Sequence, residues 1–124
     1  MINEDLKKNL AGLLHTKSYK EGNFTLTSGK KSEYYFDCKQ TALHPQGGYL
    51  IGKLILNLII ESEMKIKGVG GMTLGADPLI SAVTVVSYLE GHPLPGFIIR
   101  KEAKGHGTSA FLEGMVNFET GDRV

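Results

Sequence analysis

The middle of the chain alternates between strand-like and helix-like segments, and this alternation limits the possible folds more than any other feature. Residues 65–91, KIKGVGGMTLGADPLISAVTVVSYLEG, predict a short strand, a glycine turn and a helix capped by Asp77, with Pro78 at its first position and Gly91 at its end. Residues 94–101, LPGFIIRK, predict a second strand. A strand, a helix and another strand in this order are typical of a parallel sheet covered by helices. We therefore expect an α/β fold.

The first half of the chain predicts two further helices and a hairpin. Leucines recur at helical spacing within residues 4–15, which indicates an amphipathic surface helix. Two runs of β-forming residues flank the turn residues 28–31 and predict a hairpin. Pro45 opens a second helix. The apolar face predicted for that helix consists of Leu50, Ile51, Leu54, Ile55 and Leu58.

The last residues predict strands around a turn. A short strand comes before the turn Thr120-Gly121-Asp122, and Arg123-Val124 resembles the opening of another buried strand. A sheet interrupted at that point would leave core and edge uncovered. We therefore expect one domain over residues 1–124 that is incomplete at its C-terminus.

Composition limits the partners and the compartment. The chain has 124 residues and a formal net charge of +1, so anion binding must come from local clusters of charge. Cys38 is the single cysteine, which excludes an internal disulfide, and the four histidines give no zinc-ligand spacing. The N-terminus lacks the features of a secretory signal, and the most apolar stretch, residues 54–60, is too short to span a bilayer. We expect a cytoplasmic protein that binds neither nucleic acid nor membrane.

The glycine turn before Asp77 has two interpretations. The dinucleotide-binding fingerprint fails because Thr73 stands where a third glycine is needed. The phosphate-binding Walker pattern fails because Ala76-Asp77 stands where Lys-Ser or Lys-Thr is required. Asp77 at the start of the helix would also repel phosphate. A tight strand-to-helix connection and a substrate-lining turn both remain open.

Residues 100–107, RKEAKGHG, form a basic segment that directly follows a predicted strand. Its candidate anion-binding residues are Arg100, Lys101, Lys104 and His106. Three permanent cations against Glu102 give a local charge of +2. Arginine forks onto phosphate oxygens and lysine adds a point charge, so a diphosphate matches this segment, and its glycines suit a lid. The alternatives are a solvated basic loop and a nucleic-acid patch, although no aromatic residue is present for bases to stack on.

Tyr34, Tyr35 and Phe36 follow one another in the second strand of the predicted hairpin. Successive side chains of a strand point to opposite faces, so at least one ring must point away from the core. A flat ring beside a basic segment could hold a planar anionic heterocycle. Core packing is the alternative role of these rings.

FTLTSGKKSEYYFD, GGMTLGADP and RKEAKGHGTSAFLEG, in this order and at this spacing, resemble orotate phosphoribosyltransferase over essentially the whole chain. The resemblance implies a type I phosphoribosyltransferase fold, a central mainly parallel sheet flanked by helices with an N-terminal helix and hairpin hood. It implies Mg²⁺-dependent transfer of ribose 5-phosphate from 5-phosphoribosyl 1-diphosphate to N1 of orotate in pyrimidine biosynthesis. The products would be orotidine 5′-monophosphate and diphosphate. It further implies homodimers in which the loop of one subunit closes over the site of the other.

By the same resemblance, the diphosphate would be contacted by Arg100, Lys101, Lys104 and His106, with Lys104 as the catalytic residue. Tyr35 and Phe36 would line the orotate pocket. No protein residue is assigned to the metal, which would be bound mainly through the diphosphate. Thr27 and Leu74 stand where some relatives have lysine, so these two lysine contacts are not carried over.

The resemblance also implies an N-terminal portion, because the acidic phosphoribosyl diphosphate loop of the family would follow Val124. That loop binds the ribose 5-phosphate, so we expect the 124-residue chain alone to be inactive. The alternative function is a catalytically silent binding module of the same ancestry that senses a nucleotide or RNA. A preference for RNA with a steep salt dependence would favour that module.

Overall fold

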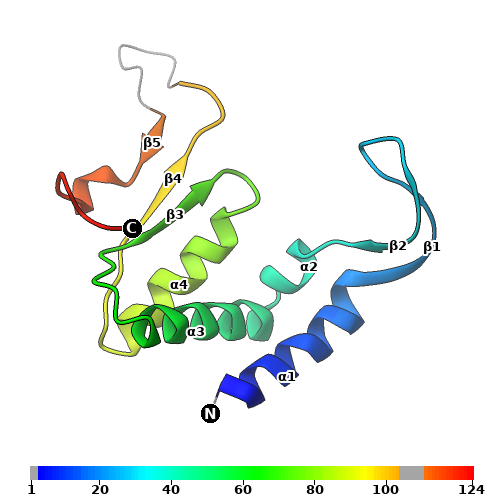
Figure 1. Cartoon of the computed structure of the whole chain (residues 1–124), viewed down its shortest axis with the longest axis horizontal. Helices are drawn as coiled ribbons and strands as arrows, with labels where there is room; N and C mark the ends of the chain where they lie inside the picture. The colour runs from blue at the N-terminus through cyan, green and yellow to red at the C-terminus, as the bar shows by residue number, and fades with distance from the viewer. Residues whose placement is uncertain (1–2, 104–110) are drawn as a thin grey trace.

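The computed structural model describes residues 3–103 and 111–124 and contains a three-stranded sheet, a separate hairpin and several helices (Figure 1). The longer helices are α1 (Asn3–Leu13), α3 (Pro45–Glu61) and α4 (Asp77–Leu89). The strands are β1 (Tyr19–Thr25), β2 (Lys31–Phe36), β3 (Val69–Met72), β4 (Gly96–Ile99) and β5 (Leu112–Glu113). The short elements are the π-helix η1 (Leu14–Ser18), α2 (Lys39–Ala42) and the 3₁₀-helix η2 (Met115–Asn117).

The main sheet has the strand order β3-β4-β5. β3 pairs with β4 in parallel, from Val69 opposite Gly96 to Met72 opposite Ile99, and α4 connects the two strands. This confirms the strand-helix-strand prediction for the middle of the chain. β5 pairs with β4 in the antiparallel direction, so the described sheet is mixed, with one parallel and one antiparallel pair.

Helix α4 covers one face of this sheet at close range, because the strands place glycines beneath it. A Cβ atom on Gly71 would lie 2.7 Å from the Cβ of Ala76, and one on Gly96 would lie 2.5 Å from Cγ2 of Ile80. On the other face the rings of Phe97 and Phe118 meet edge to face, with centroids 5.5 Å apart. The glycines therefore let α4 approach the sheet.

The core contains two buried clusters that lie on different sides of α3. Leu6, Leu50 and Leu54 join α3 to α1, whereas Leu56 packs with Val83 and Val86 of α4. The predicted apolar face of α3 is therefore only partly right. Leu54 is buried, but Leu58 is 58% exposed, and Leu56, which was not included in the predicted face, is fully buried. The single-face prediction failed because two different helices pack on α3.

Gly52 lies where α3 packs tightly against α4, and we expect Gly52→Ala to destabilise the protein by up to about 2 kcal/mol. A Cβ atom at Gly52 would lie 2.6 Å from the backbone oxygen of Ala82, so a backbone must shift. Overpacking of this kind costs about 1–3 kcal/mol, which exceeds the gain in helix propensity of about 1 kcal/mol. Chemical denaturation measures the difference.

Gly12 of α1 is the matched control for this prediction. A Cβ atom there would meet nothing within 4 Å, so Gly12→Ala should keep the propensity gain and stabilise by about 0.5–1 kcal/mol. Equal effects of the two substitutions would contradict the close packing of α3 on α4.

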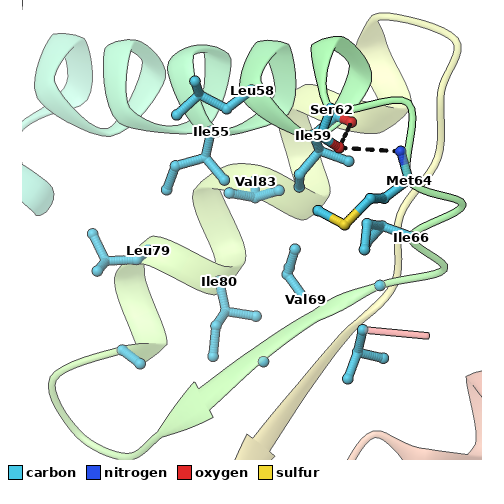
Figure 2. A pocket seen from close by; sticks show the side chains of 14 residues that line it. Ile55, Leu58, Ile59, Ser62, Met64, Ile66, Val69, Leu79, Ile80 and Val83 are labelled. Carbon is cyan, nitrogen blue, oxygen red and sulfur yellow. Dashed lines mark hydrogen bonds between the residues drawn. The ribbon is translucent and has the colours of Figure 1, made fainter.

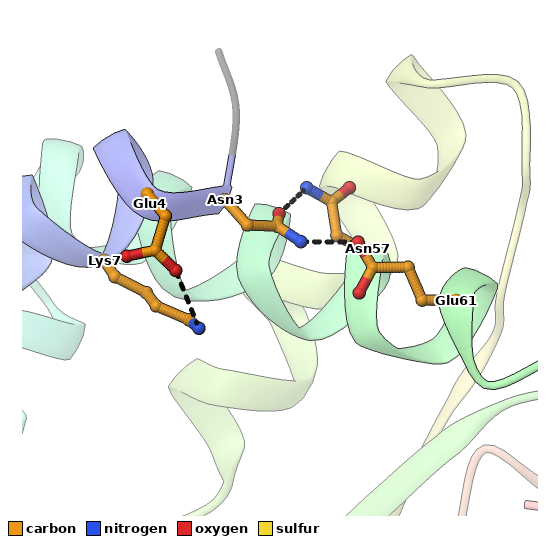
Figure 3. A network of polar contacts seen from close by, with 5 residues as sticks. All are labelled: Asn3, Glu4, Lys7, Asn57 and Glu61. Atoms are coloured by element: carbon orange, nitrogen blue, oxygen red, sulfur yellow. Dashed lines mark hydrogen bonds and ion pairs between the residues drawn. The ribbon is translucent and has the colours of Figure 1, made fainter.

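A polar network ties the start of α1 to the end of α3 (Figure 3). The Asn57 side-chain amide donates to Asn3 Oδ1 at 2.6 Å, and the Asn3 amide donates to Glu61 Oε1 at 2.5 Å. Glu4 and Lys7 form an exposed ion pair beside the network. Asn57 interrupts the most apolar stretch of the sequence, and its side chain binds the start of α1 through Asn3.

β1 and β2 form the predicted hairpin, which projects from the end of α1 away from the main sheet (Figure 1). Its base is fixed by a buried hydrogen bond of 2.6 Å between the hydroxyls of Ser18 and Thr41. His44 caps α3, because its Nδ1 accepts hydrogen bonds from the backbone N–H groups of Gln46 and Gly47. The hairpin prediction is confirmed, and the helix prediction at Pro45 is confirmed with a histidine cap.

Two local predictions are wrong. Asp77 does not cap α4, because it is the first residue of the helix. The N-cap position is Ala76, and no side-chain hydrogen bond caps the helix there. Arg123-Val124 is not a strand in this structure, although the Arg123 carbonyl accepts a 2.7 Å hydrogen bond from Lys67 N–H. Gly91, with a φ of +75°, follows the end of α4 as predicted.

Candidate functional site

The candidate functional site lies where the parallel strands β3 and β4 end. Ligands of open α/β sheets bind outside the carboxyl ends of the strands. The ends lie side by side, since Thr73 N–H donates to the Ile99 carbonyl at 3.0 Å. A cavity of about 540 Å³ opens there, lined by Thr73, Ile98, Arg100, Lys101, Glu102 and Glu113. We call this cavity the strand-end pocket.

Arg100 is held in the strand-end pocket by its backbone and its side chain. Its N–H donates to the Phe111 carbonyl at 2.6 Å, which continues the pairing of β4 beyond Ile99. Its Nη1 lies 3.0 Å from Glu113 Oε1, and each of the two side chains is 38% exposed. An ion pair this exposed contributes at most about 1 kcal/mol, so an incoming anion can displace the carboxylate.

Of the other three predicted diphosphate contacts, only Lys101 lies within the described residues. Lys101 is exposed and lines the strand-end pocket beside Arg100. Lys104 and His106 lie outside the described residues. The structure therefore brings together Arg100 and Lys101, with carboxylates of Glu102 and Glu113 in the same lining.

The glycine turn acts as a connection and also contributes to the lining. Thr73 lines the strand-end pocket, and its hydroxyl donates to Asp77 Oδ2 at 2.8 Å. Asp77 Oδ1 is buried and has no hydrogen-bond partner within the part of the chain that the structure describes. Leu74 in this turn is 69% exposed. The turn therefore connects β3 to α4 as one interpretation predicts, and its threonine lines the pocket, whereas a substrate-lining role stays a prediction.

The predicted orotate residues, Tyr35 and Phe36, lie on opposite faces of the hairpin. The Tyr35 ring packs against Phe24, with centroids 5.7 Å apart, and lines a cavity at the hairpin turn. The Phe36 ring packs against Tyr19, with centroids 5.2 Å apart, and against Tyr34. Both rings are nearly half exposed, so core packing is not their role in the described structure. Their role in an orotate pocket stays a prediction.

Hydrogen bonds shift two pKa values near the base of the hairpin. The hydrogen bond to Glu21, with burial and the Glu21 charge adding to it, raises the pKa of Tyr19. The hydrogen bond from Gln40 lowers the pKa of Asp37, helped by the backbone N–H of Lys39. Neither residue lines the strand-end pocket. These shifts therefore belong to the hairpin base and not to the candidate site.

The hairpin lies apart from the strand-end pocket. Figure 1 shows β1 and β2 at one side of the molecule and the ends of β3 and β4 nearer its middle, separated along the long axis. Segments that are separated in a projection are separated in space. In one copy of the described chain the hairpin that carries Tyr35 and Phe36 therefore lies apart from the ends of β3 and β4.

In the part of the chain that the structure describes, no group of three or more His, Cys, Asp or Glu side chains could hold a metal ion. The described donor set therefore does not by itself fit a Mg²⁺ site. Within residues 3–103 and 111–124, no helix has the length and apolarity needed to cross a bilayer.

The comparisons identify the relatives of the chain. It is 51% identical to the orotate phosphoribosyltransferase of Nostoc sp. over 119 residues, which cover 96% of this chain and 56% of that enzyme. The Mycobacterium tuberculosis orotate phosphoribosyltransferase in complex with Fe(III) dicitrate superposes with a TM-score of 0.73 at 37% identity, over 88% of this chain and 59% of the other. The chain is homologous to a portion of orotate phosphoribosyltransferase. This confirms the resemblance and the fold.

The chain matches only part of the length of its relatives. The chain spans slightly more than half the length of the curated orotate phosphoribosyltransferases that it matches. The same Mycobacterium tuberculosis enzyme in complex with 5-phospho-α-D-ribosyl 1-diphosphate superposes with a TM-score of 0.64 at 32% identity, over 88% of this chain and 56% of the other. No protein-family model matches the chain. The described residues adopt the corresponding part of the type I phosphoribosyltransferase fold.

Thr73 and Glu113 are polar residues of the strand-end pocket that the sequence pattern did not indicate. Thr73 was considered only as a missing glycine, although its place after a strand was a usable signal. Glu113 is eleven residues beyond Glu102 in the sequence, and only the antiparallel pairing of β5 with β4 brings it to Arg100. No local pattern predicted that contact.

Proposed function

We propose that the chain forms part of an orotate phosphoribosyltransferase and that the strand-end pocket binds the diphosphate of 5-phosphoribosyl 1-diphosphate. The observation that carries this proposal is the position of Arg100 and Lys101 at the carboxyl ends of parallel strands, in a chain homologous to these enzymes. The reaction breaks the bond from C1 of the ribose to the diphosphate oxygen and forms a bond from C1 to N1 of orotate. The products are orotidine 5′-monophosphate and diphosphate.

Arg100 and Lys101 act on the charge that develops as the diphosphate leaves. Cations aimed at those oxygens stabilise the transition state more than the ground state, because negative charge accumulates there as the bond breaks. We assign the same role to Lys104 and His106, which continue the basic segment, with Lys104 as the catalytic residue. Arginine offers paired donors and lysine a point charge, which together suit a diphosphate.

We propose that orotate binds against Tyr35 and Phe36 and that the enzyme is a homodimer. A planar ring can stack on either aromatic side chain, and both are nearly half exposed on the hairpin. The separation of the hairpin from the ends of β3 and β4 in one chain supports a site built from two copies (Figure 1). In such a dimer the basic segment of one subunit closes over the site of the other.

The proposal also covers the metal ion of the reaction and the cellular compartment of the enzyme. We propose that Mg²⁺ arrives on the diphosphate, since the described residues do not fit a metal site of their own. The ion would neutralise charge on the diphosphate oxygens when bound. We also propose a cytoplasmic enzyme that binds neither nucleic acid nor membrane. The single cysteine, Cys38, and the net charge of +1 support this assignment.

Activity and ligand preference test the proposed function. The test protein is the 124-residue chain joined to the remaining portion of the Nostoc enzyme, which we call the completed protein. We expect it to form orotidine 5′-monophosphate from orotate and the sugar donor with Mg²⁺ present. Calorimetry should show binding of the sugar donor and no binding of a short RNA. A folded completed protein that forms no product and prefers RNA would overturn the proposal.

Glu113→Gln should increase the affinity for diphosphate. The carboxylate competes with the ligand for Arg100, whose Nη1 lies 3.0 Å from Glu113 Oε1. Removing one nearby negative charge is worth about 1 kcal/mol at a partly exposed site, which corresponds to about a fivefold lower Kd. Calorimetry with inorganic diphosphate measures the change. Glu119→Gln is the control, because Glu119 is exposed and does not line the pocket, and an equal gain there would contradict this assignment.

A further inference from the structure

Asp77 contacts the strand-end pocket indirectly, through the hydroxyl of Thr73. Thr73 lines the pocket, and its Oγ1 donates a hydrogen bond to Asp77 Oδ2 at 2.8 Å. Asp77 is not part of that lining. The other oxygen of its carboxylate, Oδ1, is buried, and no group within residues 3–103 and 111–124 donates to it. Asp77 can therefore influence an occupant of the pocket by way of Thr73.

Helix α4 fixes the position of the Asp77 carboxylate. Asp77 is the first residue of the helix, where the helix macrodipole stabilises a negative charge. Figure 2 shows the apolar residues beyond it, where the Ile80 side chain extends from α4 toward β3. Val69 of β3 packs against the buried cluster that contains Val83 of α4. The start of α4 therefore has a defined place relative to the end of β3.

The turn between Thr73 and Asp77 is closed by its own backbone. Ala76 N–H donates to the Met72 carbonyl at 3.0 Å, and Asp77 N–H donates to the Leu74 carbonyl at 3.3 Å. These bonds do not involve the Thr73 hydroxyl. Removing that hydroxyl should therefore leave the path of the turn unchanged, so the bond from Thr73 to Asp77 is available for a role toward a ligand.

The Asp77 carboxylate determines how the Thr73 hydroxyl can bind a ligand. A hydroxyl has one proton and two acceptor lone pairs, whereas an ionised carboxylate only accepts. Because the proton of Thr73 points at Asp77 Oδ2, the Thr73 oxygen can only accept a hydrogen bond from an occupant of the pocket. Hydrogen bonds to a charged group are about twice as strong as those between neutral groups, so the proton stays on this side. A phosphate oxygen, which also accepts, is a poor partner for Thr73.

The sugar donor of the proposed reaction carries a suitable hydroxyl beside its diphosphate. In 5-phospho-α-D-ribosyl 1-diphosphate, the form bound by the superposed Mycobacterium tuberculosis enzyme, the 2-hydroxyl lies on the carbon next to C1 and on the same face of the ring as the diphosphate. Arg100 and Lys101 line the same pocket as Thr73. A diphosphate held by these two cations would bring the 2-hydroxyl close to the Thr73 oxygen.

We propose that Asp77 is a positioning residue that makes Thr73 the hydrogen-bond acceptor for the ribose 2-hydroxyl. This inference rests on the proposed function, because it places the sugar donor in the strand-end pocket. Thr73 would contact the substrate, whereas Asp77 would act through Thr73. A site built to bind a substrate hydroxyl rejects the analogue without it, because the acceptor then stays unpaired. The pair would therefore help to select ribose over deoxyribose.

Calorimetry of the completed protein with Mg²⁺ present tests the role of Thr73. The measured quantity is the hydroxyl ratio, which is the Kd of the 2-deoxy analogue divided by the Kd of the sugar donor. Thr73→Val keeps the branched shape without the hydroxyl and should lower the hydroxyl ratio about threefold to tenfold, the effect of one hydrogen bond. Thr73→Ser keeps the hydroxyl and should leave the ratio within about twofold. A purely structural role would weaken both ligands equally, so an unchanged ratio in Thr73→Val would overturn the proposal.

Two substitutions of Asp77 separate its hydrogen bond from its charge. Asp77→Ala and Asp77→Asn both remove the charge, but the asparagine amide oxygen can still accept the proton of Thr73. We expect Asp77→Ala to lower the hydroxyl ratio about as much as Thr73→Val, because the released hydroxyl can turn its proton toward a phosphate oxygen. Asp77→Asn should leave the ratio within about twofold, and adding Thr73→Val to Asp77→Ala should have little further effect. Equal ratios in Asp77→Ala and Asp77→Asn would contradict the positioning role.

The same titrations distinguish this inference from the proposed function. If the unsubstituted completed protein binds the sugar donor but Thr73→Val leaves the hydroxyl ratio unchanged, the role of Thr73 and Asp77 is overturned and the proposed function stands. If the unsubstituted protein binds no sugar donor, the proposed function is overturned and this inference with it.

Discussion

Leu56→Ala is expected to lower the free energy of unfolding by about 3–4 kcal/mol. The Leu56 side chain is fully buried and packs against Val83, Val86 and Leu94, the buried residues that join α3 to α4 and to the segment before β4. The substitution removes apolar contact area and leaves a cavity that rigid neighbours fill only in part. Since small domains have a total stability of about 5–15 kcal/mol, the variant should lose a large share of it.

Chemical denaturation of the 124-residue chain checks this result, with Leu58→Ala as the matched control. Leu58 lies two residues further along the same helix and is 58% exposed, so its truncation should cost less than about 0.5 kcal/mol. The two substitutions have the same helix propensities, so their difference measures burial alone. Similar losses in the two variants would show that Leu56 is not in the core.

Lys104→Ala is expected to lower the kcat of the completed protein by about 100- to 1,000-fold while the KM for orotate changes little. Lys104 lies outside the described residues, so the prediction rests on its place in the basic segment and on the homology. A cation that meets the departing diphosphate acts mainly in the transition state, whereas orotate binds elsewhere. Steady-state kinetics with varied orotate separates the two constants.

Lys39→Ala is the control for Lys104→Ala. Lys39 is an exposed lysine at the start of α2 and does not line the strand-end pocket. Its removal changes the net charge equally and should leave kcat within about twofold. An unchanged kcat for Lys104→Ala, or an equal loss for both variants, would remove Lys104 from the proposed catalytic role.

Local sequence patterns were sufficient to predict most of the helices and strands. The hairpin turn, Pro45 at the start of α3 and Gly91 after α4 depend on neighbours in sequence, and the structure places each element as expected. The opposite orientation of Tyr35 and Phe36 also follows from the two-residue period of a strand. Asp77 was mistaken for a cap because the actual cap differs by one residue.

The sequence by itself determined the type and order of the hairpin β1-β2 and of α3, β3, α4 and β4, though not the short helix α2, and the presence of cations directly after β4. These depend on side-chain periodicity and turn chemistry within short segments. Only the tertiary structure decided that Leu56 is buried while Leu58 is exposed, and that Glu113 meets Arg100. Those outcomes depend on which elements pack together across long sequence separations. An apolar periodicity shows that a helix has a buried face, but the neighbouring helices and strands select the residues that form it.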